Sequence, residues 1–422
     1  MDLLRPRIQP YPWGTVDAIA DLQGRSVPAP GPEAELWMGA HPSAPSALVR
    51  LPAASPSPPS SVALDTVIAA DPDGELGPEC AARFGGRLPF LLKVLSAAKA
   101  LSIQVHPSRA QAEAGYAAEN ARGLPLGDPG RNYVDDWPKP ELLYALTPFE
   151  VAAGLRPPSG ASALLQALEV DELKPLAAGL TDMRVALKSI LQWPEPARLV
   201  SEVVAACRRL AASDSQYADA CAAAVRVASD HPADIGVVAL LLMRHEVLQP
   251  GQAVFMPAGG LHAYLRGTGI ELLANSDNVV RSGLTGKHID VPELLKLLDP
   301  TVAVPVLSPH PVRDGITTFD TPAPEFRLYL INLTASASPA PAPSPVPAPP
   351  GPALALPGAG PRILLCLDGA CSLRAASGSA LDLTRGDSCF IPFADGPVHA
   401  TGSARLALAT PGKCLEHATE PG

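Results

Sequence analysis

The hydrophobic pattern predicts that the first 150 residues are rich in β-strands and turns. Residues 88–95 form an apolar run between polar neighbours, and residues 101–106 alternate apolar and polar positions. Both patterns are typical of strands, the first fully buried and the second half-buried. Residues 138–144 begin with Pro, which suits the entry of a strand. Residues 149–155 are mainly apolar and predict a further strand.

Between residues 159 and 246 the pattern becomes helical. Apolar residues recur at three- and four-residue spacing, and Ala, Leu, Arg and Glu are frequent. Four or five helices are expected, including residues 161–168, 183–191, 196–211 and 215–228. The β pattern returns at Leu248, so we interpret residues 159–246 as a helical insertion within a β domain. A simple domain boundary near residue 160 is the alternative.

After the insertion, short strands return. Residues 291–298 predict a short helix, which Asp299-Pro300 ends. Residues 336–357 are a Pro/Ala tract that buries little apolar area, so a disordered loop or linker is expected, with a Pro-rich docking site as the alternative. Later strands are expected at regular spacing, which is typical of a sandwich or barrel. They cover residues 362–367, 379–383, 389–393 and 405–409.

The stretch 250–265 predicts a strand, a tight corner and a second strand. Five residues separate Gly251 from Pro257, and Gly259 and His262 follow. Pro and Gly interrupt β-ladders, which favours a corner that presents His262 at the start of the second strand. This spacing resembles the second motif of the cupin β-barrels. A hairpin whose histidine is merely packed is the alternative.

The same glycine-to-proline spacing recurs at Gly386 and Pro392, which predicts a second barrel. Position 397 is Pro where the first copy has His262, so the second barrel is expected to hold no metal. The predicted fold class is mainly β, with two cupin-type jelly-roll barrels and an inserted α-helical domain. The expected domains are a catalytic barrel (1–158 plus 247–310), the insertion (159–246) and a C-terminal barrel (311–422).

Composition narrows the function classes. The formal charge of −10 disfavours a general nucleic-acid binder, although a local basic pocket can still serve a small anion. The apolar run at 237–243 is far shorter than the ~20 residues of a membrane span, and residues 1–14 show no secretory signal. The seven cysteines are scattered without a Cys-x-x-Cys motif, which we interpret as reduced thiols of a cytoplasmic protein.

Four residues outside the helical stretch predict a metal site. Gln104 and His106 lie two apart on a predicted strand and therefore share a face. Glu141 follows a proline that interrupts the ladder, which can aim its carboxylate inward. With His262 these residues offer two imidazoles, one carboxylate and one amide oxygen, a set typical of catalytic zinc. Taken singly, each has an ordinary alternative as a hydrogen-bonded buried residue.

Several segments resemble the type I mannose-6-phosphate isomerase (phosphomannose isomerase) family. The most specific is residues 269–295, and the resemblance fades after about residue 310. The other matching segments are residues 11–14, 34–42, 88–107, 139–141, 231–242 and 250–265. The resemblance implies a zinc-dependent aldose–ketose isomerase that interconverts D-mannose 6-phosphate and D-fructose 6-phosphate through a cis-enediol and feeds GDP-mannose metabolism.

The resemblance also implies the site residues. One Zn²⁺ per chain would be bound by Gln104, His106, Glu141 and His262. The family's essential arginine falls on Arg281, and residues proposed to hold the sugar phosphate fall on Lys93, Ser102, Lys139 and Lys287. Gly286 stands where the family usually has Pro before the lysine.

Chemical reasoning supports two of these roles and leaves the general base open. Arg281 is always charged and binds two oxygens at once, which suits it to stabilise a developing negative charge. Lys287 would serve the phosphate as a point charge, and a solvated surface loop is the alternative for both cations. Candidates for the base are Glu271, Asp277 and Lys139, and a structural ion pair is the competing interpretation of Glu271.

Tyr264 lies two residues from His262 on the same strand face, so it is expected to line the site and hydrogen-bond the sugar, with packing alone as the alternative. The expected partner is a small sugar phosphate, with no nucleic acid and no membrane, and the protein is expected to be a monomer or a weak homo-oligomer. The helical insertion is expected to cover one side of the site.

Two other functions stay open. One is another metal-dependent cupin enzyme, such as an iron oxygenase. The candidate ligand set has Gln104 instead of a third histidine, which argues against an oxygenase. The other is a non-catalytic, sugar-phosphate-binding bicupin, against which the cations Arg281 and Lys287 argue.

Overall fold

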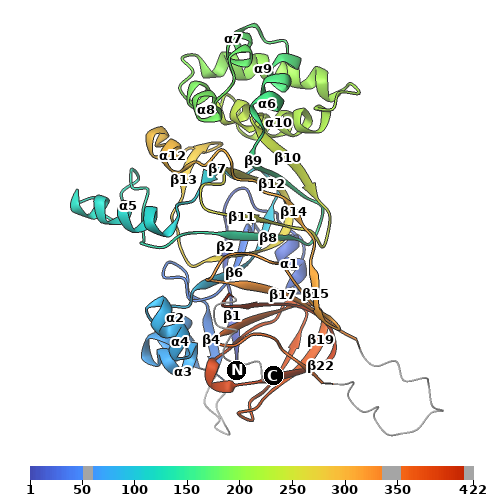
Figure 1. The fold of residues 1–422 in the computed structure, drawn as a ribbon. Helices are drawn as coiled ribbons and strands as arrows, with labels where there is room; N and C mark the ends of the chain where they lie inside the picture. The colour runs from blue at the N-terminus through green and yellow to red at the C-terminus, as the bar shows by residue number, and fades with distance from the viewer. Residues whose placement is uncertain (51–59, 335–352, 413–422) are drawn as a thin grey trace, which may run out of the picture. The chain divides into compact units, whose positions relative to one another are not determined.

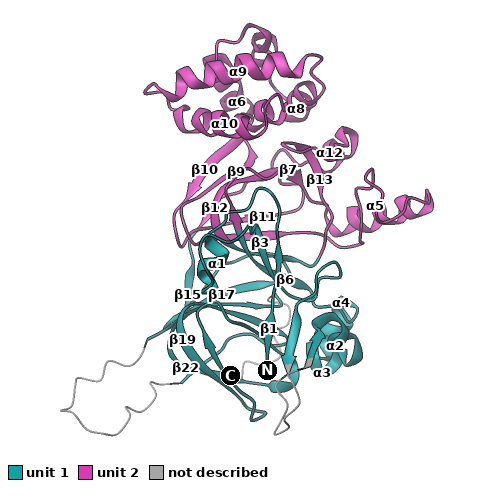
Figure 2. Ribbon diagram, turned by 180° about the vertical axis from the view of Figure 1, so that it is seen from behind, with its two compact units in different colours: residues 1–95, 270–275, 308–422 teal, residues 96–269, 276–307 magenta. Residues whose placement is uncertain are grey.

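The computed structural model describes residues 1–50, 60–334 and 353–412 of the chain (Figure 1). Its residues form two compact units (Figure 2). Unit 1 comprises Met1–Leu95, Ile270–Asn275 and Ser308–Gly422, and unit 2 comprises Ser96–Gly269 and Ser276–Leu307. The chain therefore crosses between the units several times. The three-part domain division expected from the sequence stays a prediction.

Unit 1 is built on an antiparallel sheet in the order β15-β16-β17-β22-β19-β21-β1-β4-β5, with β18 beside β22 and β20 beside β19. Its longest strands, β19 (Arg362–Ala375) and β22 (Val398–Thr410), are each far longer than the segments that the sequence predicts. The other strands are β1 (Asp2–Arg5), β4 (Ala47–Arg50), β5 (Ser60–Ala63), β15 (His310–Arg313), β16 (Ile316–Thr318), β17 (Arg327–Leu333), β18 (Leu354–Ala355), β20 (Ala380–Thr384) and β21 (Ser388–Ile391).

A second set of strands in unit 1 carries the predicted site residue Lys93. β3 (Glu35–Met38) pairs antiparallel with β2 (Arg7–Gln9) and with β6 (Phe90–Ala97). All eight residues of β6 are buried, as its mainly apolar sequence predicts, and Lys93 is buried with them. The unit also contains α1 (Ala18–Leu22), α2 (Leu64–Ala70), α3 (Pro72–Leu76), α4 (Pro78–Phe84) and the 3₁₀ turn η2 (Phe393–Asp395).

In unit 2, antiparallel pairing joins β13-β7-β12-β9-β10 and β8-β11-β14. These strands are β7 (Ile103–Val105), β8 (Glu141–Ala145), β9 (Phe149–Leu155), β10 (Met243–Leu248), β11 (Ala253–Met256), β12 (His262–Ala274), β13 (Val280–Gly283) and β14 (Val306–Leu307). The last residues of β12, from Ile270 onward, belong to unit 1.

The helical segment of unit 2 follows the sequence pattern closely. α8 (Met183–Leu191) and α9 (Pro196–Ala211) have the predicted bounds. Asp182 caps α8 by accepting from Arg184 N at 2.8 Å, and Pro196 occupies the first turn of α9. The segment also contains α6 (Pro158–Ala167), η1 (Asp171–Leu173), α7 (Lys174–Ala178), α10 (Ala218–Asp230) and α11 (Gly236–Leu240), and its apolar faces share one buried cluster.

Two expectations need correction. The fold is mixed rather than mainly β, because α1 to α4 and α5 (Arg109–Ala121) lie within the first 150 residues in addition to the helical segment and α12 (Val291–Leu297). Helices of five to seven residues are too short to reveal a helical period, and α5 is rich in Ala rather than in large apolar residues. Most of the Pro/Ala tract at 336–357 lies outside the described residues, but Leu354–Ala355 at its end pair with β22.

The two predicted corners share a backbone conformation. Gly251 and Gly386 have φ of 97° and 89°, in the left-handed region that favours glycine. Each lies two residues before a strand, β11 or β21. Among the described residues, none of the helices has the length and apolar character that crossing a membrane requires.

Candidate metal centre

Strand register places three predicted site residues in one row. Gln104 in β7 is the direct ladder partner of His262 in β12 on one side and of Arg281 in β13 on the other. Residues directly opposite each other in antiparallel strands project from the same face. His262, Gln104 and Arg281 therefore lie side by side across three strands.

His106 and Glu141 complete the cluster from strand ends. His106 follows the last residue of β7, and Glu141 is the first residue of β8. Glu141 Oε1 lies 3.1 Å from His106 Nε2, and its Oε2 lies 3.3 Å from His262 Nε2. The ligand atoms of these three residues all fall within 4.8 Å of one another. The side-chain amide of Gln104 lies 3.3 Å from His262 Nε2, so all four predicted ligands meet.

The donor atoms suit a zinc ion. His106 Nδ1 donates to Asn278 O at 2.7 Å, and His262 Nδ1 donates to Gly260 O at 3.1 Å. Each bond leaves the Nε2 lone pair free for a metal, which is the usual arrangement around metal-binding histidines. His106 Nε2 is buried and makes no hydrogen bond within the described part of the chain. A buried pair of imidazoles with a carboxylate is a zinc ligand set with room for a further ligand.

Electrostatics keeps the ligands in the forms that bind metal. Burial, reinforced by Lys139, lowers the pKa of His106 to about 4, so its imidazole is neutral at physiological pH. Burial alone would raise the pKa of Glu141, but the charge of Lys139, the largest opposing influence, helps to hold that pKa well below its usual range. Lys139 Nζ lies 3.0 Å from Glu141 Oε1. Glu141 is therefore an anion inside the protein.

Tyr264 contacts the same carboxylate. Its hydroxyl donates to Glu141 Oε2 at 3.1 Å, and its ring packs edge-on against Phe149 with centroids 5.8 Å apart. Tyr264 is 1% exposed. Its hydroxyl therefore already has a protein partner, which a sugar would have to share.

The segment after β12 gathers two cations and one carboxylate. Burial lowers the pKa of Arg281, and the charge of Asp277 opposes that shift. The pKa of Lys287 is also lowered, chiefly by repulsion from Arg281. Lys287 and Asp277 are exposed, and Arg281 is half-buried. A pair of cations that repel each other favours an anionic ligand, which would relieve the repulsion.

The helical segment holds this loop through a residue that sequence reasoning missed. Asp234 accepts from Gly236 N at 2.7 Å and from Thr285 N at 3.1 Å. A Cβ added to Gly236 would lie 2.7 Å from Leu284 N, so the two backbones approach closely. Asp234 falls within a segment that resembles the isomerases, and that resemblance was its one available signal. Whether the helical segment covers one side of the site stays a prediction.

Lys93 and Glu271, both in unit 1, form a buried ion pair. Lys93 Nζ lies 3.1 Å from Glu271 Oε2 and 3.4 Å from Glu35 Oε1, and it stands 4.8 Å from the centroid of the Trp37 ring. The ion pair considered as the alternative for Glu271 is thus present. Ser102 is half-buried, one residue before β7.

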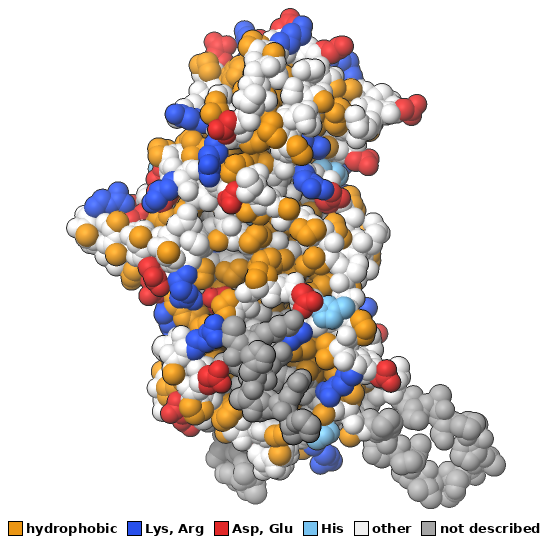
Figure 3. Space-filling model, viewed as in Figure 1, with side chains coloured by type: hydrophobic (Ala, Val, Ile, Leu, Met, Phe, Trp, Pro, Cys, Tyr) orange, Lys and Arg blue, Asp and Glu red, His pale blue; other side chains and the backbone are white. Residues whose placement is uncertain are grey.

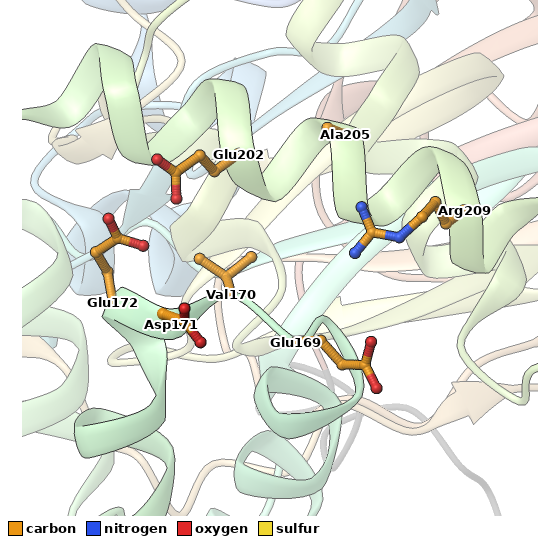
Figure 4. Close-up of a pocket in the computed structure, with 7 residues that line it drawn as sticks. All are labelled: Glu169, Val170, Asp171, Glu172, Glu202, Ala205 and Arg209. Atoms are coloured by element: carbon orange, nitrogen blue, oxygen red, sulfur yellow. The ribbon is translucent and has the colours of Figure 1, made fainter.

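A separate hollow on the helical segment carries no comparable chemistry. It has a volume of about 430 Å³ and is lined mainly by charged side chains, including Glu169, Asp171, Glu202 and Arg209 (Figure 4). Glu172, also in the lining, pairs with Arg198. Of the described residues, those around Glu141 are the ones that form a His/Cys/Asp/Glu cluster able to hold a metal.

Fold and site together define a metalloprotein whose ion would lie against an antiparallel sheet. Comparison with known proteins agrees. The family model for the phosphomannose isomerase type I catalytic domain matches residues 1–158. The mannose-6-phosphate isomerase of Escherichia coli K12 is 36% identical over 96% of this chain and 98% of its own length, and mannose-6-phosphate isomerase 1 of Arabidopsis thaliana is 30% identical over 96% and 92%.

Solved structures give the same result. A zinc-bound mannose 6-phosphate isomerase matches with a TM-score of 0.83 and 32% identity, covering 97% of this chain and 99% of that one. A mutant phosphomannose isomerase from Salmonella typhimurium matches with a TM-score of 0.84 at the same identity and coverage. The chain belongs to the type I phosphomannose isomerase family.

Proposed function

We propose that this protein is a zinc-dependent isomerase that interconverts D-mannose 6-phosphate and D-fructose 6-phosphate. The observation that carries the proposal is the buried meeting of His106, Glu141 and His262, with Gln104 between His262 and Arg281 in the ladder. Family membership supplies the substrate. The product would feed mannose and GDP-mannose metabolism.

In this proposal Gln104, His106, Glu141 and His262 hold one Zn²⁺ per chain. When bound, zinc supplies Lewis-acid polarisation of the substrate oxygens. Glu141 contributes a negative charge to the ligand set, and Lys139 keeps that carboxylate ionised. Tyr264 and Lys139 fix the carboxylate from two sides through contacts of 3.1 and 3.0 Å.

The charged residues beside the ligands would act on the sugar phosphate. Arg281 stabilises the negative charge that develops on the sugar oxygens as the cis-enediol forms, because its guanidinium is charged before the reaction begins. Lys287 attracts the phosphate. We also propose that Lys93 and Ser102 contribute to substrate binding, as the resemblance implies.

A general base must move a proton between C1 and C2. Lys139 lies against a metal ligand, Glu271 is engaged by Lys93, and Asp277 lies near Arg281. All three stay candidates. A base needs hydrogen-bond reach to the sugar carbon that it deprotonates, so a complex with substrate would choose among them.

We further propose that the sheets form two cupin-type jelly-roll barrels. The similar backbone at Gly251 and Gly386 supports this, and Pro397 in place of a histidine makes the second barrel a structural one. The protein is proposed to be a monomer or weak homo-oligomer in the cytoplasm. The proposed location is consistent with six buried cysteines that form no disulfide among the described residues. Basic and acidic side chains are interspersed on the face seen in Figure 3, which disfavours a nucleic-acid partner.

Turnover of mannose 6-phosphate in a coupled assay for fructose 6-phosphate tests the proposal. Zinc-loaded protein should convert the substrate, and removal of zinc with a chelator should abolish conversion. Binding of mannose 6-phosphate without turnover would instead support a non-catalytic bicupin. Bound iron with oxygen uptake would support another cupin enzyme.

A further inference from the structure

Asn278 joins the segments that carry the metal ligands, and sequence reasoning gave it no role. It lies between β12 and β13 and is 0% exposed. Its Oδ1 accepts from Val134 N at 2.8 Å, and its Nδ2 donates to Asp135 O and Trp137 O, each at 2.8 Å. The side chain therefore holds residues 134–137, the segment that leads directly into Lys139 and Glu141.

The backbone of the same residue orients a metal ligand. Asn278 O accepts the 2.7 Å hydrogen bond from His106 Nδ1. This bond places the proton of the neutral ring on Nδ1 and leaves Nε2 as the lone-pair donor. If that carbonyl shifted, the ring could rotate or carry its proton on Nε2, where it would block a metal.

Asp135 secures the contact from the other side. Its carboxylate accepts from Ser276 Oγ at 2.8 Å and from Asp277 N at 2.9 Å, and it also accepts from Trp137 N at 2.9 Å. Two segments more than 140 residues apart in sequence are thus clamped by reciprocal bonds. The position of the Asn278 carbonyl is set by this clamp rather than by a β-ladder.

We propose that Asn278 is a positioning residue of the metal centre, which fixes the tautomer of His106 and the placement of the Glu141 segment together. The inference rests on the proposed zinc site but not on the identity of the substrate. Its hydrogen bonds reach two of the ligand-bearing segments, and Arg281 follows three residues later in the chain. Loss of its side chain should therefore weaken zinc binding even though Asn278 never touches the ion.

Zinc affinity in competition with a chelator tests the proposal. Asn278→Ala should bind zinc about 10–100-fold more weakly than the unaltered protein, the usual effect of removing a residue that orients a ligand. The absorption spectrum of the cobalt-substituted protein should change as well, because the ring of His106 is no longer held. A purely structural residue would lower thermal stability without moving either readout.

Asn275→Ala is the matched control. Asn275 lies three residues earlier, and its side chain donates to Leu88 O at 3.2 Å, a residue outside the ligand-bearing segments. Its zinc affinity and cobalt spectrum should match those of the unaltered protein. If Asn278→Ala does not fold, Asp135→Asn is the second variant. It replaces a carboxylate oxygen that accepts from the backbone N–H of Asp277, and it should weaken zinc binding at least about tenfold.

Unchanged zinc affinity and an unchanged cobalt spectrum in folded Asn278→Ala would overturn the proposal, as would the same result in Asp135→Asn. These zinc-binding results do not depend on whether the protein is an isomerase. If the unaltered protein binds zinc but does not convert mannose 6-phosphate, the proposed function fails while the role of Asn278 is still decided by the affinities.

Discussion

Gln104 stands directly opposite His262 in the ladder between β7 and β12, although 158 residues separate them in the chain. The helical segment accounts for much of that separation. Gln104, in the three-residue strand β7, thereby has His262 of β12 on one side and Arg281 of β13 on the other.

Removal of a ligand should remove the metal. His262→Ala should lose stoichiometric zinc and at least about 100-fold in kcat, because a Lewis-acid metal supplies several kcal/mol of transition-state stabilisation. Metal analysis and the coupled assay measure both effects. His245→Ala, whose ring pairs with Glu150 outside the cluster, should keep its zinc. Full activity of zinc-free His262→Ala would contradict the site.

Arg281 should affect catalysis more than metal binding. Arg281→Met should lower kcat by about 10²–10³-fold, the usual effect of removing one preorganised hydrogen-bond donor that stabilises developing charge. Its zinc content should be unchanged. Arg281→Lys should recover part of the loss, since it keeps the charge but not the planar pair of donors. Steady-state kinetics on zinc-loaded proteins measures both. Equal rates for Arg281→Met and the unaltered protein would rule out the proposed role.

Substrate binding should weaken at alkaline pH. Repulsion from Arg281 lowers the pKa of Lys287, so its ammonium loses its proton at a lower pH than an ordinary lysine does. Attraction for a phosphate dianion needs the protonated form, so KM should rise as the pH increases through that lowered pKa. Lys287→Arg stays charged and should shift the rise to higher pH. Superimposable KM profiles from about pH 7 upward would show that Lys287 does not hold the phosphate.

The loop that carries Lys287 should depend on Asp234. Asp234→Ala leaves Gly236 N and Thr285 N without their acceptor, at a cost of about 1–3 kcal/mol in stability. KM for the sugar phosphate should rise while zinc content stays constant. Asp230→Ala, which removes only a partly exposed pair with Lys99, is the control. A normal KM in folded Asp234→Ala would separate the loop from substrate binding.

The close approach of Gly236 to that loop predicts a stability effect of its own. Gly236→Ala would place a methyl group 2.7 Å from Leu284 N and 2.9 Å from Gly283 Cα, two backbone atoms that cannot swing aside, and 2.9 Å from the Asp234 carboxylate. Thermal denaturation should therefore show a marked loss of stability. Gly286→Ala is the control, because a Cβ there meets nothing within 4 Å. Equal melting temperatures for the two variants would contradict the described packing.

Much of the fold was predictable where local pattern and tertiary environment agree. The bounds of α8 and α9 follow from apolar periodicity, because each helix buries one regular face, and those of β9 follow from an apolar run that is almost entirely buried. The helices α1 to α4 were missed because five to seven residues carry too little periodic signal. The continuation of β19 and β22 beyond their apolar cores was missed for a related reason: pairing with neighbouring strands extends them through polar residues such as Ser372 and Arg374.

The sequence by itself determined which functional groups the site contains. Motif spacing and family resemblance named the imidazoles of His106 and His262, the carboxylate of Glu141, the amide of Gln104 and the cations Arg281 and Lys287. Only the tertiary structure decided how they meet. Strand register places Gln104 between His262 and Arg281, and the buried bonds of Asn278 and Asp234 hold the surrounding loops. Those contacts join residues far apart in the chain, and local sequence carries no periodic signal for them, since each depends on which strands become neighbours.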